Sequence, residues 1–326
     1  MIRKNTETWY FETSALNYFT KDRTVEDAIA TKAHQSLKGR RWVISSSVLW
    51  EILMTSNRAK REKLIYFAQN LFDRELLPSP GEILIEYIKS GFPSIEKPRK
   101  LISHTEIANI WRDLVDNPNK TFIYNINDIQ QRFNTLKPIN KLIHKIINNE
   151  NIPLIDENTE QGFQITLESA LNNLKFIKQN NYSKENKKIF KIAIFYMMFI
   201  LCAESVFENT VIQQFWKEIG IKSTFERIKY ALYHFEPIIY RGPLAALAAM
   251  VYCQSKKQYS RGIYFDSMHA FYITYVNYFF TNDQHFKDFE EFIKPHPNSY
   301  KVQFISELKF TSHTRYNVEQ RGTIIL

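Results

Sequence analysis

Short apolar runs alternate with helix-periodic segments over the first fifty residues of the chain. Trp9–Phe11 and Trp42–Ile44 are compact runs of aromatic and β-branched residues, which are typical of buried strands. Between them, Thr24–Leu37 repeats its apolar positions with the period of an amphipathic helix, and Gly39 follows where a left-handed cap is expected. Ser45–Ser47 then offers an N-cap for a further helix. This β-α-β-α order predicts a parallel sheet with crossover helices.

Helical periodicity dominates the middle of the chain. Two helices are predicted at about 61–73 and 80–89. From residue 91 to residue 240 the sequence is rich in Asn, Lys and Ile, with apolar positions at helical spacing and no convincing strand pattern. We therefore expect an all-α segment there.

The α/β pattern returns in the last quarter of the chain. Leu244–Met250 is a strong helix former, and Pro243 suits its first turn. Ile263–Phe265 is either a short strand or the start of the helix that follows it. Tyr278–Thr281 is predicted to be a buried strand, whereas Tyr300–Phe304 either adds a strand or lies over the surface.

The composition is that of a folded protein built mainly from helices. Hydrophobic residues make up 44% of the chain, enough for a core, which excludes disorder as the main state. The 8 Gly and 11 Pro are too few for a many-turned β-sandwich or barrel. Lys and Arg exceed Asp and Glu by 9, which suits a nucleic acid partner and equally suits a solvated basic surface.

Cysteine content and the apolar runs bear on the compartment. Two cysteines, Cys202 and Cys253, cannot build a disulfide framework or a Cys-rich zinc site, so a reducing compartment is expected. The first residues lack the apolar core of a signal peptide. The longest uncharged run, Ile192–Ala203, is shorter than the roughly 18 to 20 residues of a membrane helix. We expect a cytoplasmic protein that does not enter the membrane.

Four acidic residues occupy informative positions in the predicted elements. Glu12 follows the first strand and Asp283 follows the last strong one, so both face the same edge of a parallel sheet if their strands are neighbours. Glu51 and Asp266 lie near the starts of helices that leave that edge. Clustered carboxylates need a compensating cation, and oxygen ligands of this kind suit Mg²⁺ or Mn²⁺.

Four segments that contain these acids resemble the signature segments of PIN-domain nucleases. They are Tyr10–Asn17, Ser47–Leu53, Phe265–His269 and Phe280–Phe286. The most specific part is Asp266-x-x-His269 followed by Thr281-Asn282-Asp283, which resembles a bacterial PIN-like branch. The resemblance covers about residues 5–90 and 241–293, and it departs from the family at Glu12, where Asp is usual.

This resemblance implies a metal-dependent nuclease with a three-layer α/β PIN-like core around a mostly parallel sheet. Glu12, Asp266 and Asp283 would hold Mg²⁺ or Mn²⁺, and Glu51 would join them directly or through water. Further residues would orient these carboxylates or contact phosphate: Thr13, Ser14, Asn17, His269, Thr281 and Asn282. The substrate implied is RNA rather than DNA, and many such bacterial proteins are toxins or defence effectors.

Each acid also has a structural alternative. Glu12 is suited to capping the following helix, and Glu51 to pairing with Arg41 or Arg58. Asp266 is suited to an N-cap and Asp283 to a turn. His269, one helical turn from Asp266, is as readily a buried structural histidine as a phosphate contact.

The positions of the acids decide how the chain divides. At 326 residues, length alone predicts two domains or one domain with a large insertion. The acids lie before residue 52 and after residue 265, so a shared site requires the two ends to fold together. We therefore expect a PIN-like core from residues 1–90 and 241–295, a helical insertion at 91–240 and a C-terminal extension at 296–326.

Three hypotheses about function follow from the sequence. The first is an endoribonuclease whose helical insertion binds a regulatory protein or mediates self-association. The second is a catalytically degenerate PIN-like module that binds nucleic acid or protein, in which Glu12 marks lost activity. The third is a helical interaction protein whose acidic residues are incidental.

Overall fold

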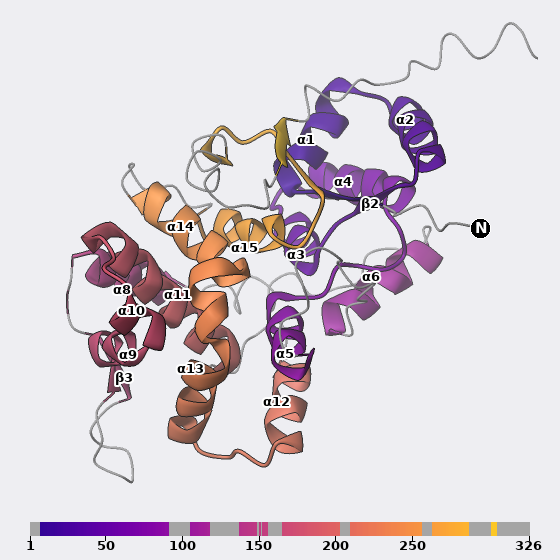
Figure 1. Cartoon of the computed structure of the whole chain (residues 1–326). Coiled ribbons are helices and arrows are strands. Elements are labelled where there is room, and N and C mark those ends of the chain that lie inside the picture. The colour runs from indigo at the N-terminus through magenta and orange to yellow at the C-terminus, as the bar shows by residue number, and fades with distance from the viewer. Residues whose placement is uncertain are drawn as a thin grey trace, which may run out of the picture.

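A four-stranded parallel sheet is the centre of the fold. The computed structural model describes residues 7–90, 105–117, 137–148, 150, 152–155, 165–202, 209–255, 263–286 and 301–304. Its strands are β1 (Glu7–Phe11), β2 (Arg40–Val43), β5 (Tyr278–Thr281) and β6 (Lys301–Phe304), in the spatial order β2-β1-β5-β6. All three pairings are parallel, as the sequence predicts for the strands it identified. Strand β1 from the N-terminal part of the chain therefore lies beside β5 from its last quarter, in the centre of the sheet (Figure 1).

Aromatic side chains hold the sheet between layers of helix. Tyr10 stacks on Tyr272 of helix α15 (Ile263–Ile273), with ring centroids 5.2 Å apart. The next residue, Phe11, lies 5.9 Å from Phe19 of helix α1 (Thr13–Asp22). Successive residues of a strand point to opposite faces, so α15 and α1 cover the two faces of the sheet. The α/β class expected from the sequence is thus present in this part of the molecule.

Local signals explain where the first helices begin and end. Thr24 caps α2 (Val25–Leu37) by accepting the backbone N–H of Asp27, and Gly39 follows with φ of 77°, as expected for a left-handed turn. Helix α3 spans Ser46–Leu53, α4 spans Arg58–Leu71 and α5 spans Pro80–Ser90. Ser45 precedes α3, but its hydroxyl bonds to Tyr10 instead of capping the helix.

The middle of the chain is mainly helical but is not all-α. Its helices are α6 (Glu106–Asp116), α8 (Lys137–Ile147), α9 (Leu167–Asn173), α10 (Lys175–Gln179), α11 (Lys184–Cys202), α12 (Asn209–Glu218) and α13 (Thr224–Arg241). Two short strands, β3 (Pro153–Ile155) and β4 (Ile165–Thr166), pair in an antiparallel manner. The expectation of an all-α insertion is therefore wrong in this detail. Strands of three and two residues are too short to give a period-two pattern.

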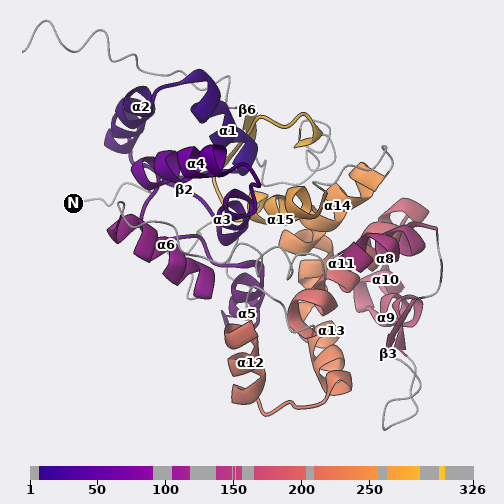
Figure 2. The same cartoon turned by 180° about the vertical axis from the view of Figure 1, so that it is seen from behind.

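Two late helices connect the helical region to the sheet. Helix α14 (Pro243–Ser255) begins at a proline in its first turn, as predicted, and packs against both α11 and α15. Figures 1 and 2 both show α14 and α15 between the sheet and the group formed by α8 to α11. Ile263–Phe265 forms the first turn of α15, which settles the choice left open by the sequence. The buried residues of all these elements form one continuous core.

The C-terminal region supplies the edge strand of the sheet. The sequence left Tyr300–Phe304 either as a strand or as surface chain, and Lys301–Phe304 pairs with β5 in parallel. The residues at 91–104 and 287–300, where the expected boundaries after residues 90 and 295 fall, lie outside the described part of the chain. Among the described helices, none combines the length and apolar character needed to cross a membrane.

Candidate metal centre

The candidate site lies at the carboxyl edge of the parallel sheet. Strands β1 and β5 are hydrogen-bonded neighbours, so Glu12 and Asp283, which follow them, share this edge. Helix α15 brings Asp266 to the same place. In open parallel sheets, this edge is where ligands bind.

Three side chains converge closely enough to share a cation. One potential ligand atom from each of Asp266, Asp283 and His285 lies within 4.8 Å of the other two. His285 Nδ1 is 3.0 Å from Asp283 Oδ1 but does not make a hydrogen bond with it, so this buried nitrogen has no hydrogen-bond partner. With Nδ1 deprotonated, both atoms present lone pairs side by side, so one metal ion can bind to the two of them. The described residues thus include one group that fits a metal centre.

The electrostatics of Asp266 are compatible with a bound cation. Burial, together with the nearby charge of Asp283, raises the pKa of its carboxyl group to about 8. His269 acts in the opposite direction, as a positive charge that favours the carboxylate. Two carboxylates this close are both ionised at neutral pH only when a cation offsets their repulsion.

Gln254 of α14 is the immediate partner of Asp266. Its side-chain Nε2 donates to Asp266 Oδ2 at 2.9 Å. The residue is only 5% exposed, and its Oε1 is a buried acceptor with no hydrogen-bond partner. An unsatisfied buried amide oxygen costs about 1–3 kcal/mol. A cation or its water beside Asp266 would satisfy this oxygen.

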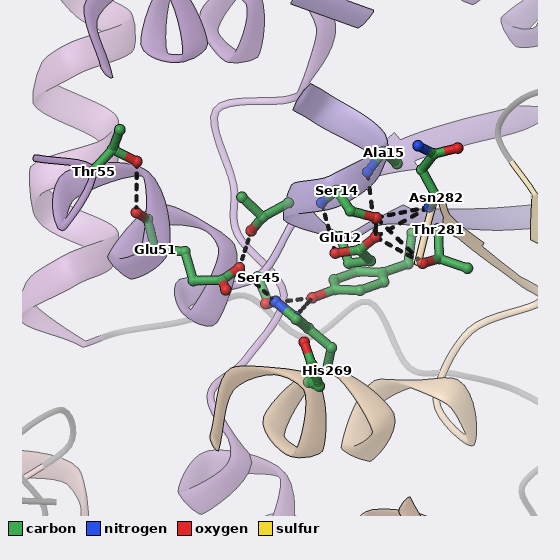
Figure 3. Close-up of polar contacts among 12 residues, drawn as sticks. Glu12, Ser14, Ala15, Ser45, Glu51, Thr55, His269, Thr281 and Asn282 are labelled. Atoms are coloured by element: carbon green, nitrogen blue, oxygen red, sulfur yellow. Dashed lines mark hydrogen bonds and ion pairs between the residues drawn. The ribbon is translucent and has the colours of Figure 1, made fainter. Parts of the chain in front are cut away.

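Glu12 occupies a cradle of hydrogen-bond donors (Figure 3). Its carboxylate accepts the backbone N–H groups of Ser14 and Ala15, so it caps α1 as the structural alternative proposed. It also accepts the hydroxyls of Ser14 and Thr281 and the backbone N–H of Asn282. Burial raises the pKa of Glu12, although His269 and the bonds from Ser14 act against the rise. Glu12 thereby joins the start of α1 to the end of β5, and it is not one of the three convergent ligands.

Glu51 belongs to a second buried network that contains His269. Its Oε2 is 2.8 Å from His269 Nε2, and it also accepts the Thr13 hydroxyl. On the other side of the ring, His269 Nδ1 lies 2.7 Å from Tyr10 Oη. Burial by itself lowers the pKa of His269, but the charge and hydrogen bond of Glu51, together with the charges of Glu12 and Asp266, outweigh burial and raise it. A protonated ring donates to both neighbours, which leaves the Tyr10 hydroxyl to donate to Ser45 Oγ at 2.9 Å.

Of the remaining site residues predicted from the sequence, Thr281 and Asn282 belong to the network around Glu12, whereas Asn17 joins neither network. Thr281 Oγ1 donates to Glu12 at 2.8 Å and accepts the backbone N–H of Asp283 at 2.9 Å, so it fixes the turn that presents Asp283. Asn282 donates its backbone N–H to Ser14 Oγ at 2.7 Å. Asn17, one turn into α1, has a buried Oδ1 with no hydrogen-bond partner.

The structural alternatives for the other acids have mixed outcomes. Arg41 and Arg58 pair with Asp73 and Glu62, so the alternative of a surface ion pair for Glu51 is wrong. Asp266 lies in the first turn of α15, which begins at Ile263, and is not its N-cap. Asp283 does act as a turn residue, because its Oδ1 accepts the backbone N–H of His285 at 2.9 Å.

Sequence reasoning missed two residues of this site. His285 follows Asp283 by two positions, and no motif marked it. Gln254 is the only amide side chain in the otherwise apolar helix α14, and that contrast was its one local signal. Comparison with protein-family models, with curated proteins and with solved structures found no match to this chain.

Proposed function

We propose that this protein is a metal-dependent endonuclease of the PIN-like kind, which hydrolyses phosphodiester bonds. The observation that carries the proposal is the convergence of Asp266, Asp283 and His285 at the carboxyl edge of the parallel sheet. The resemblance of the segments around Glu12, Glu51, Asp266 and Asp283 to PIN-domain nucleases supports it. RNA is preferred over DNA as the substrate on the strength of that resemblance alone.

The donor set indicates which cation would bind. Two carboxylates suit Mg²⁺ and Mn²⁺ equally, whereas an imidazole ligand is uncommon for Mg²⁺. His285 therefore favours Mn²⁺. A divalent cation at this position supplies Lewis acidity toward a phosphate oxygen and lowers the pKa of water within its reach.

The surrounding residues have distinct tasks in this proposal. Gln254 fixes the orientation of Asp266, and Thr281 fixes the turn that carries Asp283. Glu51 is partly exposed, with 20% of its side-chain surface accessible, and it is bonded to the buried His269. Through this pair, His269 and Tyr10 hold the Glu51 carboxylate in place, and that carboxylate also accepts the Thr13 hydroxyl.

One observation favours the second candidate, a PIN-like module that binds nucleic acid or protein without cleaving. The carboxylate of Glu12 already accepts hydrogen bonds from Ser14, Ala15, Thr281 and Asn282. It therefore caps α1 and ties that helix to the end of β5, and these bonds compete with binding of a metal ion. If metal binding needs a third carboxylate, the site would hold the cation too weakly for catalysis.

The test is cleavage by the purified full-length protein. End-labelled single-stranded RNA and DNA are incubated with Mn²⁺, Mg²⁺ or EDTA, and Mn²⁺ binding is measured separately by calorimetry. Asp266→Asn and Asp283→Asn should lower cleavage at least about a hundredfold, because each removes several kcal/mol of charge stabilisation. Asp116→Asn changes an exposed acid paired with Arg74 and serves as the matched control.

The outcomes separate the candidates. Cleavage that survives both substitutions, or that persists in EDTA, would refute the proposed centre. Metal and nucleic acid binding without cleavage would support the binding module. A toxin or defence role in the cytoplasm, with control by a protein bound to the helical region, is the cellular setting that we propose for the active enzyme.

A further inference from the structure

A basic and aromatic surface lies on the helical region, on elements distinct from those of the metal centre. It is formed by Lys175 of α10 and by Phe225, Lys229, Tyr233 and His234 of α13, and we call it the Tyr233 surface. Tyr233 is 72% exposed, the highest value among the exposed large hydrophobic side chains of the described residues. Figures 1 and 2 show α13 running away from the sheet strand β2, on the far side of α14 and α15.

Cations and rings are interleaved on this surface. Lys175 Nζ is 6.0 Å from the centroid of the Tyr233 ring, and Lys229 Nζ is 4.5 Å from that of Phe225. Both distances fit cation–π contacts. Residues 229 and 233 lie one helical turn apart, so Lys229 and Tyr233 share a face of α13.

The Tyr233 ring is supported from one side. His234 lies edge-on to it, with centroids 5.0 Å apart, and His234 in turn packs on Tyr230 at 4.1 Å. The ring is thus held at the surface by neighbours while most of its area faces solvent. A supported, exposed aromatic ring beside lysines offers a flat stacking surface.

The charge of this region is complementary to a polyanion. Residues 175–234 contain ten Lys or Arg and five Asp or Glu, an excess that accounts for over half of the net charge of +9 of the chain. Lys178 is exposed on α10 near Lys175, whereas Glu226 is an exposed acid on α13. The balance still favours an anionic partner.

We propose that the Tyr233 surface binds single-stranded nucleic acid. A base stacks on the Tyr233 ring, and the phosphates on either side contact Lys175 and Lys229. Single strands combine accessible base faces with closely spaced phosphates, and proteins that bind them use this combination of aromatic and basic groups. A duplex hides its base faces, so it binds here only through its phosphates. This binding does not require the metal centre and goes beyond the proposed catalytic function.

The test is equilibrium binding of the full-length protein in EDTA, measured by fluorescence anisotropy with labelled single-stranded and double-stranded oligonucleotides. Tyr233→Ala should weaken single-strand binding about tenfold, whereas Tyr233→Trp should retain it, because base–aromatic stacking needs only a ring. Lys175→Glu should weaken binding and lower the slope of log Kd against log salt by about one or more. Tyr66→Ala removes another exposed tyrosine, on α4, and is the matched control.

Several results would overturn the proposal. The first is that the parental protein does not bind the single strand. The second is that the Tyr233→Ala variant binds the single strand as tightly as the Tyr66→Ala control. The third is that the parental protein binds single and double strands with equal affinity. Binding to an acidic peptide that excludes the oligonucleotide would assign the surface to a protein partner instead. The binding assay is run in EDTA and does not depend on the metal. If the parental protein fails to cleave in the separate Mn²⁺ assay, that result counts against the nuclease proposal and does not affect the proposed single-strand binding.

Discussion

Replacing Asp266 by Asn should stabilise the metal-free protein, and should do so more as the pH rises. The carboxyl group of Asp266 has its pKa raised to about 8 by burial and by Asp283, from an ordinary value of 3.8. The folded protein therefore holds a proton here that the unfolded chain releases. This contribution to stability is complete below pH 3.8 and is lost as the pH rises to about 8. An amide mimics the protonated acid at every pH, and its oxygen can still accept from Gln254.

The magnitude follows from the distance between the two pKa values. Between about pH 5 and pH 7 the unfolded carboxyl is ionised and the folded one is protonated, so each pH unit costs the wild type about 1.4 kcal/mol relative to the Asn variant. Over these two units the variant should gain about 3 kcal/mol. Added Mn²⁺ should reverse the order, because it stabilises the wild type in proportion to its binding and does little for the variant.

The assay is urea unfolding of EDTA-treated protein, followed through the buried tryptophans, of which Trp42 and Trp111 are fully enclosed. It is run for both proteins from pH 5 to pH 8. If the difference in unfolding free energy is independent of pH, then Asp266 is not held protonated by its surroundings. If Mn²⁺ stabilises both proteins equally, then Asp266 does not hold the cation.

Three further substitutions test the rest of the site. Gln254→Leu should weaken Mn²⁺ binding about tenfold to a hundredfold by calorimetry while the fold persists, because outer hydrogen bonds tune metal affinity; unchanged affinity would remove Gln254 from the site. Glu12→Ala should cost at least about 3 kcal/mol in urea unfolding, since it leaves buried donors unpaired, whereas Glu26→Ala on the exposed first turn of α2 should cost little. Tyr10→Phe should cost about 1–3 kcal/mol by isolating the His269 ring and Ser45, and a loss no greater than that of Tyr66→Phe would contradict the buried network.

The elements that the sequence predicted well are those specified by local signals. Thr24 and Gly39 mark the ends of α2 because capping depends on residues within one turn. Tyr278–Thr281 was recognisable as a strand because a run of aromatic residues must be buried. The antiparallel pair of β3 and β4 was missed because strands of three and two residues are too short to establish a period-two pattern.

The site was only partly predictable because its members are defined by contacts across the chain. Glu51 meets His269 across 218 positions in the sequence, and no spacing rule connects them. Gln254 and His285 become site residues only because α14, α15 and the end of β5 converge. Glu12 and Asp283 were identified from their positions after strands, and Glu51 and Asp266 from their positions near the starts of helices. Their separate tasks depend on which hydrogen-bond donors the tertiary fold places beside each one.

The choice of Glu over Asp at position 12 has a physical reason in this arrangement. The longer side chain turns back to the backbone N–H groups of Ser14 and Ala15, and also reaches Thr281 and Asn282 beside it. Bringing residues 269 positions apart together costs chain entropy, and several hydrogen bonds to one buried carboxylate help to offset that cost. Because Thr281 also holds the turn before Asp283, the hydrogen bonds of Glu12 that join α1 to β5 help to position a candidate metal ligand. Stability of the discontinuous core and alignment of the candidate metal centre therefore depend on the same carboxylate.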